Sequence, residues 1–205
     1  MNLIERIEDL KIKIGDIVEK RIREFEEMQN KEDIYWYHEL CFCILTANTS
    51  AEMGIRVQNA ISPEEFANLD YSELSKRLHE LGYRFYKTRA KYIFENREYS
   101  KNIKKILIGL NKEEKREFLI KNLKGIGNKE ASHFLRNVGY KDYAIIDKHI
   151  FKIMKEYNLT NEKNVNGKNY YELEKILTKV GEKVNLDLGR LDLYLWYMET
   201  GKVLK

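Results

Sequence analysis

Lys129 and Asp147 are the two side chains of this sequence best suited to chemistry. Lys129 ends the run Gly-Ile-Gly-Asn-Lys at 125–129, and Asp147 stands in the run Ile-Ile-Asp-Lys-His-Ile-Phe at 145–151. A neutral lysine amine is a nucleophile that forms Schiff bases, and a carboxylate can shuttle protons or stabilise a developing positive charge. The pair therefore indicates a site in which an amine and a carboxylate act together.

The two glycines before Lys129 predict a phosphate-binding turn between two helices. Gly125 and Gly127 can adopt positive φ and bring the backbone close to a ligand without a Cβ in the way. The helix expected from about residue 128 leaves its first amides without intrahelical partners, and these amides and the helix dipole favour an anion. Such a helix–hairpin–helix contacts phosphate without reading the base sequence. A turn that only joins two packed helices is the alternative.

Both reactive side chains also have ordinary structural explanations. Asp147 precedes a helix expected over 148–157, where aspartate is a good N-cap. We expect both roles together, because a capping carboxylate is held rigidly. Lys129 taken alone would be a solvated lysine. A cation in the first turn of a helix is unfavourable, however, which favours the neutral amine that a nucleophile needs.

The hydrophobic pattern predicts an all-α chain. Apolar residues recur at spacings of three and four, and no period-two alternation is sustained. Ser62 followed by Pro63 predicts an N-cap with proline at the first helical position. The apolar stripe of the first helix is expected to comprise Leu3, Ile7, Leu10, Ile14 and Ile17. The helices are expected near 2–29, 33–47, 49–61, 63–68, 71–81, 86–97, 101–109, 112–123, 129–138, 148–157, 168–182 and 186–199, with some merging to leave about ten.

Composition bounds the class of protein. The chain is 43% hydrophobic, which is enough for a sizeable core, and no apolar run approaches the roughly 20 residues that span a bilayer. The first residues alternate charge with apolar side chains and do not resemble a signal peptide, so we expect a cytoplasmic protein without a membrane partner. The net charge of +4 is too small to establish a nucleic-acid partner by itself.

Cysteine and histidine usage argues against a metal centre. Cys41 and Cys43 are the only cysteines, so one chain cannot supply four thiolates to an iron–sulfur cluster. The four histidines show no ligand-like clustering. Positions two apart on a helix point in different directions, so both cysteines are expected to be buried free thiols.

Four segments of the chain resemble the helix–hairpin–helix DNA glycosylase superfamily, which includes endonuclease III. They are 44–49, 81–93, 123–155 and 188–197. The second and the last look like the second, mostly archaeal family of 8-oxoguanine DNA glycosylase/AP lyases, which is compact and lacks an iron–sulfur cluster. The superfamily often has Gly-Pro before its catalytic aspartate, where this chain has Ile145-Ile146, but endonuclease III-like members also lack that proline.

This resemblance implies an enzyme of base-excision DNA repair. Lys129, Asp147 and His149 match the lysine, aspartate and histidine of the family motif. Lys129 is then the nucleophile that excises a flipped 8-oxoguanine through a Schiff base and nicks the strand by β-elimination. Asp147 is the second catalytic residue, which stabilises charge on the sugar or shuttles protons.

Further residues are expected to contact the DNA or the flipped base. The expected DNA-binding set is Gly125, Gly127, Lys124, Asn48 and His149. In this set Asn48 fills the gap left by the base, with a turn residue as the alternative, and His149 lies near the 5′ phosphate, with a helix-surface histidine as the alternative. Phe85, Trp196 and the α-carboxylate of Lys205 are expected to recognise the base. A core tryptophan and a frayed tail are the alternatives for the last two.

The resemblance also implies two helical lobes with the active-site cleft between them. One lobe is expected over about 31–140, with the hairpin at 123–131, and the other over about 1–30 and 141–205. The expected partner is double-stranded DNA with 8-oxoguanine or abasic sites. We expect a prokaryotic, nucleoid-associated monomer that requires no cofactor and has a structural monovalent cation at the hairpin.

Two other functions remain open from the sequence. One is a glycosylase for another damaged base, such as an oxidised pyrimidine, against which the match at 188–197 argues. The other is a non-catalytic helix–hairpin–helix DNA-binding module. That module accounts for the glycines and the basic charge, but it leaves the pairing of Lys129 with Asp147 unexplained.

Overall fold

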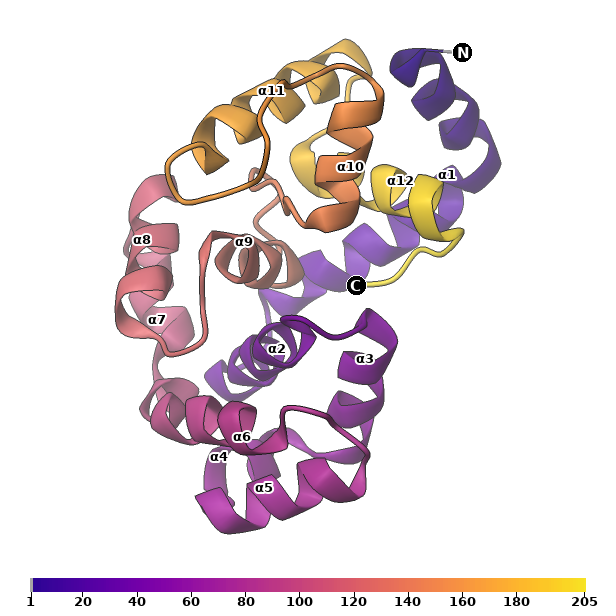
Figure 1. Ribbon diagram of the computed structural model, residues 1–205. Coiled ribbons are helices and arrows are strands. Elements are labelled where there is room, and N and C mark those ends of the chain that lie inside the picture. Colours follow the sequence, from indigo (N-terminus) through magenta and orange to yellow (C-terminus); the bar gives the residue numbers. More distant parts are fainter. Residues whose placement is uncertain (1) are drawn as a thin grey trace. The chain divides into compact units, whose positions relative to one another are not determined.

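The computed structural model describes residues 2–205, and every regular element in that part of the chain is a helix (Figure 1). The helices form two compact units. Unit 2 is Asn30–Phe134, and unit 1 combines the residues up to Gln29 with Leu135–Lys205. The all-α class expected from the sequence is confirmed.

The boundary between the units lies inside helix α9 (Asn128–Asn137), rather than near residue 140 as expected. The reason is visible at Arg136, in the last turn of this helix. Its Nη1 pairs with the Asp192 carboxylate at 3.1 Å, and its guanidinium lies 4.4 Å from the centre of the Phe25 ring. These contacts assign the end of α9 to unit 1.

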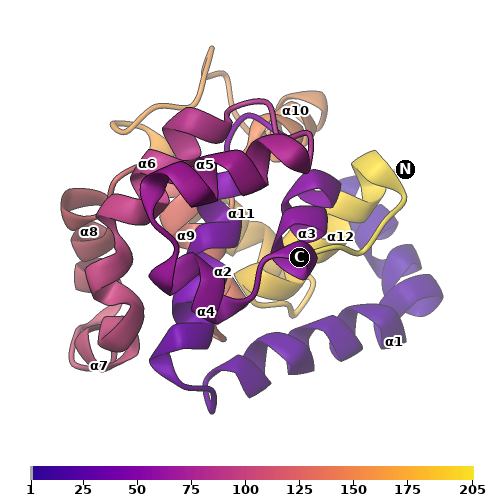
Figure 2. The same ribbon diagram turned by 90° about the horizontal axis from the view of Figure 1, so that it is seen from below.

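Unit 2 is built around α2, which packs against α3, α4, α6, α7 and the 3₁₀ helix η1 (Figure 2). Most of α2 is buried, so it has no polar face, and Cys41 and Cys43 are fully buried free thiols as predicted. The elements of this unit before α9 are α2 (Asp33–Thr46), α3 (Ala51–Ala60), α4 (Pro63–Asn68), α5 (Tyr71–Glu80), α6 (Tyr86–Glu95), η1 (Arg97–Lys101), α7 (Ile103–Ile108) and α8 (Lys112–Asn122).

Unit 1 is built around α12, which packs against α1, α10 and α11. Its elements are α1 (Leu3–Met28), α10 (Lys148–Glu156), α11 (Tyr170–Lys183) and α12 (Leu188–Thr200). The apolar stripe of α1 is correct from Leu3 to Ile14 but wrong at Ile17, which is 55% exposed. Val18, four residues after Ile14, continues the stripe instead and is fully buried.

The helix ends agree with the predicted ends to within two residues, and at several of them local capping chemistry fixes the start. Ser62 accepts a hydrogen bond from the Glu65 N–H while the Glu65 carboxylate accepts from the Ser62 N–H, and Pro63 takes the first helical position. The same reciprocal capping box starts α1, α5 and α8. None of the expected helices merge, and the 3₁₀ helix η1 was not predicted.

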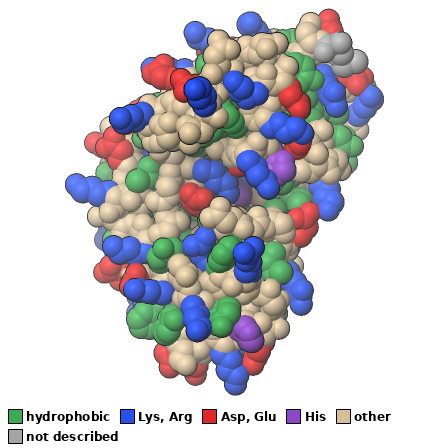
Figure 3. Space-filling view, in the orientation of Figure 1, with side chains coloured by type: hydrophobic (Ala, Val, Ile, Leu, Met, Phe, Trp, Pro, Cys, Tyr) green, Lys and Arg blue, Asp and Glu red, His purple; other side chains and the backbone are tan. Residues whose placement is uncertain are grey.

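Surface charge does not by itself mark a site. Figure 3 shows Lys and Arg side chains dispersed among acidic ones over the visible face of each unit, consistent with a net charge of +4. Among the helices in residues 2–205, none is both long enough and apolar enough to cross a membrane.

Candidate active site

The hairpin between α8 and α9 depends on Gly125. Its φ is +78°, and a Cβ there would lie 2.5 Å from Cδ2 of Tyr92. Both the backbone conformation and the available space therefore require glycine. Gly127 differs from the prediction, because its φ is not positive. It is instead the residue before α9, and its carbonyl accepts the first hydrogen bond of that helix, from the Ala131 N–H at 2.9 Å.

The residue at the C-terminal end of α6 supports this hairpin through hydrogen bonds. Asn96, which is 1% exposed, donates from Nδ2 to the Lys124 carbonyl at 2.9 Å and accepts from the Lys124 N–H at 2.9 Å. The pair of bonds fixes the backbone of Lys124 in the way that a neighbouring β-strand does. Ile126, between the two glycines, is 7% exposed and anchors the turn in the core, as the sequence indicated. The turn is therefore rigid before any ligand arrives.

One amide of the expected phosphate clamp is already occupied. The Gly127 N–H, just before the helix, donates to Oε2 of Glu130 at 3.2 Å. The amides of Asn128 and Lys129 belong to the first turn of α9, where the geometry of a helix provides no intrahelical acceptor. An anion at this helix end would meet those amides and compete with the Glu130 carboxylate for Gly127.

Lys129 is the second residue of α9 and is half-buried. Among the described residues of unit 2, its Nζ has no hydrogen bond or ion pair, which is also true of other lysines of this unit, such as Lys121 and Lys124. An amine without a fixed partner is available for reaction. The structure therefore places this side chain beside the rigid hairpin, and no described residue of unit 2 bonds to its nitrogen.

In unit 1, an extended segment over Ala144–Ile146 leads to Asp147. The Tyr170 hydroxyl donates to the Ala144 carbonyl at 2.8 Å and accepts from the Ile146 N–H at 3.1 Å. The Glu174 carboxylate, itself buried, accepts from the Ala144 N–H at 2.8 Å. Two side chains of α11 thus satisfy a buried backbone that has no sheet partner. Sequence reasoning missed both residues.

Asp147 is the N-cap of α10, as predicted. Its Oδ1 accepts from the N–H groups of His149 at 2.8 Å and Ile150 at 2.9 Å. Within the described part of the chain, no hydrogen bond of unit 1 reaches Oδ2. The cap and any chemistry can therefore use different oxygens of one carboxylate.

His149 and Trp196 lie together in unit 1. Their rings meet edge to face, with centroids 5.1 Å apart. Nδ1 of His149 is 3.8 Å from Oε1 of Glu199, and the same oxygen accepts a hydrogen bond from Lys152 Nζ at 2.6 Å. That hydrogen bond lowers the pKa of Glu199 below its usual range, so the carboxylate beside His149 stays negative. Both rings are half-buried, and neither is a core residue.

Asn48 and Phe85 lie in unit 2. Asn48 occupies an exposed turn after α2 and has a φ of +61°, a conformation that asparagine tolerates better than most residues. Phe85 is half-buried, with the Arg84 and Arg89 guanidiniums 5.1 and 5.7 Å from its ring centre. Arg89 also donates to the Ala47 carbonyl at 2.9 Å, next to Asn48.

The segment after α12 folds back onto unit 1. Gly201 ends the helix with a φ of +71° and donates to the Tyr197 carbonyl at 2.8 Å. Val203 then packs against the cluster formed around Leu10, Ile14 and Val18 of α1. Lys205 is half-buried. The alternative of a frayed tail is therefore wrong for this segment.

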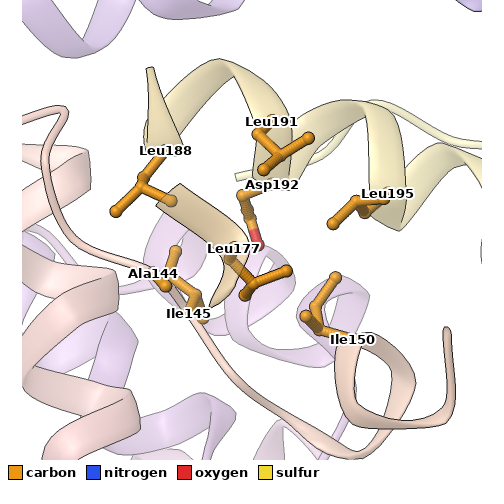
Figure 4. A pocket seen from close by; sticks show the side chains of 8 residues that line it. All are labelled: Ala144, Ile145, Ile150, Leu177, Leu188, Leu191, Asp192 and Leu195. Carbon is orange, nitrogen blue, oxygen red and sulfur yellow. The ribbon is translucent and has the colours of Figure 1, made fainter. Parts of the chain in front are cut away.

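A small pocket in unit 1 is a packing feature and not a base-binding site. Figure 4 shows its lining, which is aliphatic apart from the Asp192 carboxylate. That carboxylate already pairs with Arg136, so no polar group is left to read a base. The lining residues are Ala144, Ile145, Ile150, Leu177, Leu188, Leu191, Asp192 and Leu195. Among residues 2–205, no three His, Cys, Asp or Glu side chains are grouped to bind a metal.

The expected site residues divide between the units. Unit 2 contains Asn48, Phe85, Lys124, Gly125, Gly127 and Lys129, and unit 1 contains Asp147, His149, Trp196 and Lys205. A helical fold, a glycine hairpin, an unengaged lysine after it and a capping aspartate define the helix–hairpin–helix class of DNA glycosylases. The chain belongs to the 8-oxoguanine DNA glycosylase family, whose model matches residues 18–186.

Relatives of known name match the chain over more than nine tenths of its length. A protein of Methanocaldococcus jannaschii named 8-oxoguanine DNA glycosylase/AP lyase is 53% identical, with both chains fully covered. One of the same name from Picrophilus torridus is 45% identical over 93% of this chain and 91% of the relative. The crystal structure of the Methanocaldococcus jannaschii enzyme with a 15mer DNA containing 8-oxoguanine has a TM-score of 0.96 and 52% identity, again with full coverage of both chains. That of the Thermotoga maritima enzyme has a TM-score of 0.93, 43% identity and coverage of 99% and 98%.

Proposed function

We propose that this chain is a bifunctional DNA glycosylase and AP lyase that removes 8-oxoguanine from double-stranded DNA. The observation that carries the proposal is Lys129, which follows a rigid glycine hairpin at the second position of α9. This lysine stands in a chain 53% identical over its full length to a relative named for both activities. A structural relative crystallised with DNA that contains 8-oxoguanine supports the same substrate.

In the first reaction, the bond from the sugar to the base is replaced by a bond from the sugar to the protein. The nucleotide leaves the stack, and the neutral Nζ of Lys129 attacks C1′ of its sugar. The bond from C1′ to the base breaks, and the base departs with the electron pair and takes up a proton. The sugar ring then opens and leaves C1′ joined to Nζ as a Schiff base.

The second reaction cuts the strand. The Schiff base acidifies the proton on C2′, and loss of that proton expels the 3′ phosphate oxygen by β-elimination. Hydrolysis of the imine returns the free amine of Lys129. Asp147 stabilises the positive charge that develops on the sugar and shuttles protons through Oδ2, while its Oδ1 stays in the α10 cap.

The remaining residues have binding roles in this proposal. The hairpin backbone at Gly125 and Gly127, with Lys124, contacts DNA phosphate, and His149 approaches the 5′ phosphate of the flipped nucleotide. Asn48, on its exposed turn, enters the gap in the stack. The base contacts of Phe85, Trp196 and the α-carboxylate of Lys205 remain predictions.

The other expectations follow from the same proposal. The enzyme acts as a monomer on nucleoid DNA in the cytoplasm of a prokaryote and requires no cofactor. A monovalent cation at the hairpin would be bound by backbone carbonyls.

Borohydride trapping on a duplex with one 8-oxoguanine tests this proposal. We expect a covalent adduct with the unmodified protein, none with Lys129→Gln, and a normal adduct with Lys121→Gln, which alters an exposed lysine of α8. Absence of an adduct, with DNA binding retained, would contradict excision of 8-oxoguanine through a Schiff base. An abasic duplex then separates a glycosylase for another lesion, which is trapped there, from a non-catalytic DNA-binding module, which is not.

A further inference from the structure

Arg89, in α6, contacts three parts of unit 2 that have separate tasks in the proposed function. Its Nη2 donates to the Ala47 carbonyl at 2.9 Å. Its guanidinium carbon lies 5.7 Å from the centre of the Phe85 ring and 5.6 Å from the centre of the Tyr92 ring. One planar cation therefore bridges a turn and two aromatic rings.

Each of these three contacts reaches a proposed DNA-binding element. Ala47 directly precedes Asn48, and its carbonyl belongs to the turn in which Asn48 adopts positive φ. Phe85 is the proposed stacking residue for the base. The Tyr92 ring occupies the space that a side chain at Gly125 would need, so it braces the hairpin. Arg89 is thus the common neighbour of the gap-filling turn, the base-stacking ring and the hairpin brace.

The geometry requires arginine at this position. A guanidinium is flat and can stack on a ring while its edge donates a hydrogen bond in the same plane. A lysine keeps the charge but presents a compact ammonium that cannot lie against two rings and reach a carbonyl as one rigid group. The single substitution Arg89→Lys therefore keeps the charge of this side chain and removes its planar shape.

We propose that Arg89 is a positioning residue for base excision. It fixes the turn carrying Asn48 relative to Phe85, so that filling the gap and stacking the flipped base occur as one event. This inference rests on the proposed function, because it assumes that Asn48 and Phe85 act on the flipped nucleotide. Its consequence is that the shape of Arg89 matters more for removing a base than for cutting a site that has already lost its base.

Arg97 of the same unit provides a matched control. Its guanidinium lies 3.9 Å from the centre of the Phe94 ring, and its Nη2 donates to the Leu69 carbonyl. In both arginines, Nε is buried without a hydrogen-bond partner among the described residues. Both side chains combine a ring contact with a hydrogen bond to a carbonyl, but Phe94 and Leu69, which Arg97 contacts in this way, have no proposed part in DNA binding.

The experiment compares Arg89→Lys with Arg97→Lys in single-turnover excision of 8-oxoguanine opposite each of the four bases. We expect Arg89→Lys to lower the excision rate about tenfold or more and to change the ratios among the four partner bases. Cleavage of a preformed abasic site should change far less, and Arg97→Lys should alter none of these rates. Arg89→Gln, whose flat amide can still donate, replaces Arg89→Lys if thermal unfolding shows that variant to be unfolded.

A double-mutant cycle with Asn48→Ala tests whether Arg89 acts through the turn. If it does, Arg89→Lys costs less in the Asn48→Ala background than in the unmodified protein. Additive losses, or equal effects of Arg89→Lys and Arg97→Lys, would overturn the positioning role while 8-oxoguanine excision by the unmodified protein upheld the proposed function. An unmodified protein that excises no 8-oxoguanine would overturn the proposed function itself.

Discussion

At the scale of single residues, Asp147 combines a structural role with a proposed chemical one. Its Oδ1 caps α10 through two backbone N–H groups, and an amide oxygen can accept the same bonds. We therefore expect Asp147→Asn to unfold at nearly the same temperature as the unmodified protein. Base excision should fall by roughly 10²- to 10⁴-fold, because the carboxylate charge and the proton acceptor are lost. Thermal unfolding and single-turnover excision measure the two effects.

Asp142→Asn is the control for this substitution. Asp142 is exposed, five positions before Asp147 in the same connection between helices, and has no proposed part in the chemistry. Its substitution should leave excision unchanged. Turnover by Asp147→Asn at the rate of the control would remove Asp147 from the mechanism and leave it only the cap.

Gly125 supports a second prediction, because two different effects exclude other residues there. Gly125→Ala forces alanine into a φ of +78° and places its Cβ 2.5 Å from Tyr92, whereas Gly82→Ala imposes a similar φ of +76° with nothing within 4 Å. Backbone strain of this kind costs about 1–3 kcal/mol. We expect both variants to lose stability, Gly125→Ala more, and only Gly125→Ala to bind DNA more weakly. Chemical denaturation and a DNA-binding titration measure this. Equal losses in both assays would mean that Tyr92 moves aside without consequence.

At the scale of elements, two side chains of α11 hold the segment that precedes Asp147. The Tyr170 hydroxyl satisfies the Ala144 carbonyl and the Ile146 N–H, both buried. Tyr170→Phe leaves these two groups without that partner, and an unsatisfied buried polar group costs about 1–3 kcal/mol. We expect a lower unfolding temperature and slower excision together, because Asp147 directly follows the loosened segment.

The neighbouring Tyr171 supplies the comparison for Tyr170→Phe. This residue is 37% exposed, and Tyr171→Phe removes the same kind of hydroxyl group from the same helix. We expect that variant to stay close to the unmodified protein in stability and in excision. Loss of stability by Tyr170→Phe with full excision would show that the segment holds Asp147 in place without the hydroxyl.

The elements also show what the sequence could and could not predict. Helix ends were predictable because a cap and its partner lie within a few residues, as with Ser62 and Glu65. The side-chain hydrogen bonds that hold the site segments in place were not predictable, because their partners are distant in the chain. Asn96 bonds across 28 residues, Glu174 across 30 and Arg89 across 42. No local pattern distinguishes such residues from ordinary polar side chains.

At the scale of the whole molecule, the sequence predicted the local structure of the candidate site better than its long-range contacts. The run around Gly125 and Lys129 and the capping Asp147 are short motifs whose local structure follows from the residues themselves. The roles of Phe85, Trp196 and Lys205 rest on their residue types and, for the last two, on a resemblance. Base contacts depend on the folded arrangement of distant segments. Ile17 shows the same limit in the core, because helical spacing permitted either Ile17 or Val18 to face inward and packing selected Val18.

The pairing of α1 with α12 in unit 1 leads to a prediction about stability in acid. Arg190 of α12 binds Glu19 of α1 through two hydrogen bonds, Nε to Oε1 at 2.7 Å and Nη2 to Oε2 at 2.8 Å. The hydrogen bond from Arg190 lowers the pKa of Glu19 in the folded protein. Between the folded and unfolded pKa values, the unfolded chain binds more protons, so stability rises with pH there. The contribution is complete above the unfolded pKa and is lost as the pH falls through the folded one.

We therefore expect Glu19→Gln to unfold at a lower temperature than the unmodified protein at pH 7, and at the same temperature in strong acid. The Glu19 side chain is 41% exposed, so solvent screening limits its contribution to about 1 kcal/mol, or about 2–4 °C in a chain of this length. Glu24→Gln, which removes an ion pair made within α1 to Arg21, is the matched control and should shift the unfolding temperature less. Thermal unfolding across a pH series measures both variants. A difference between Glu19→Gln and the unmodified protein that persisted unchanged into strong acid would show that Glu19 stabilises α1 against α12 by packing rather than by charge.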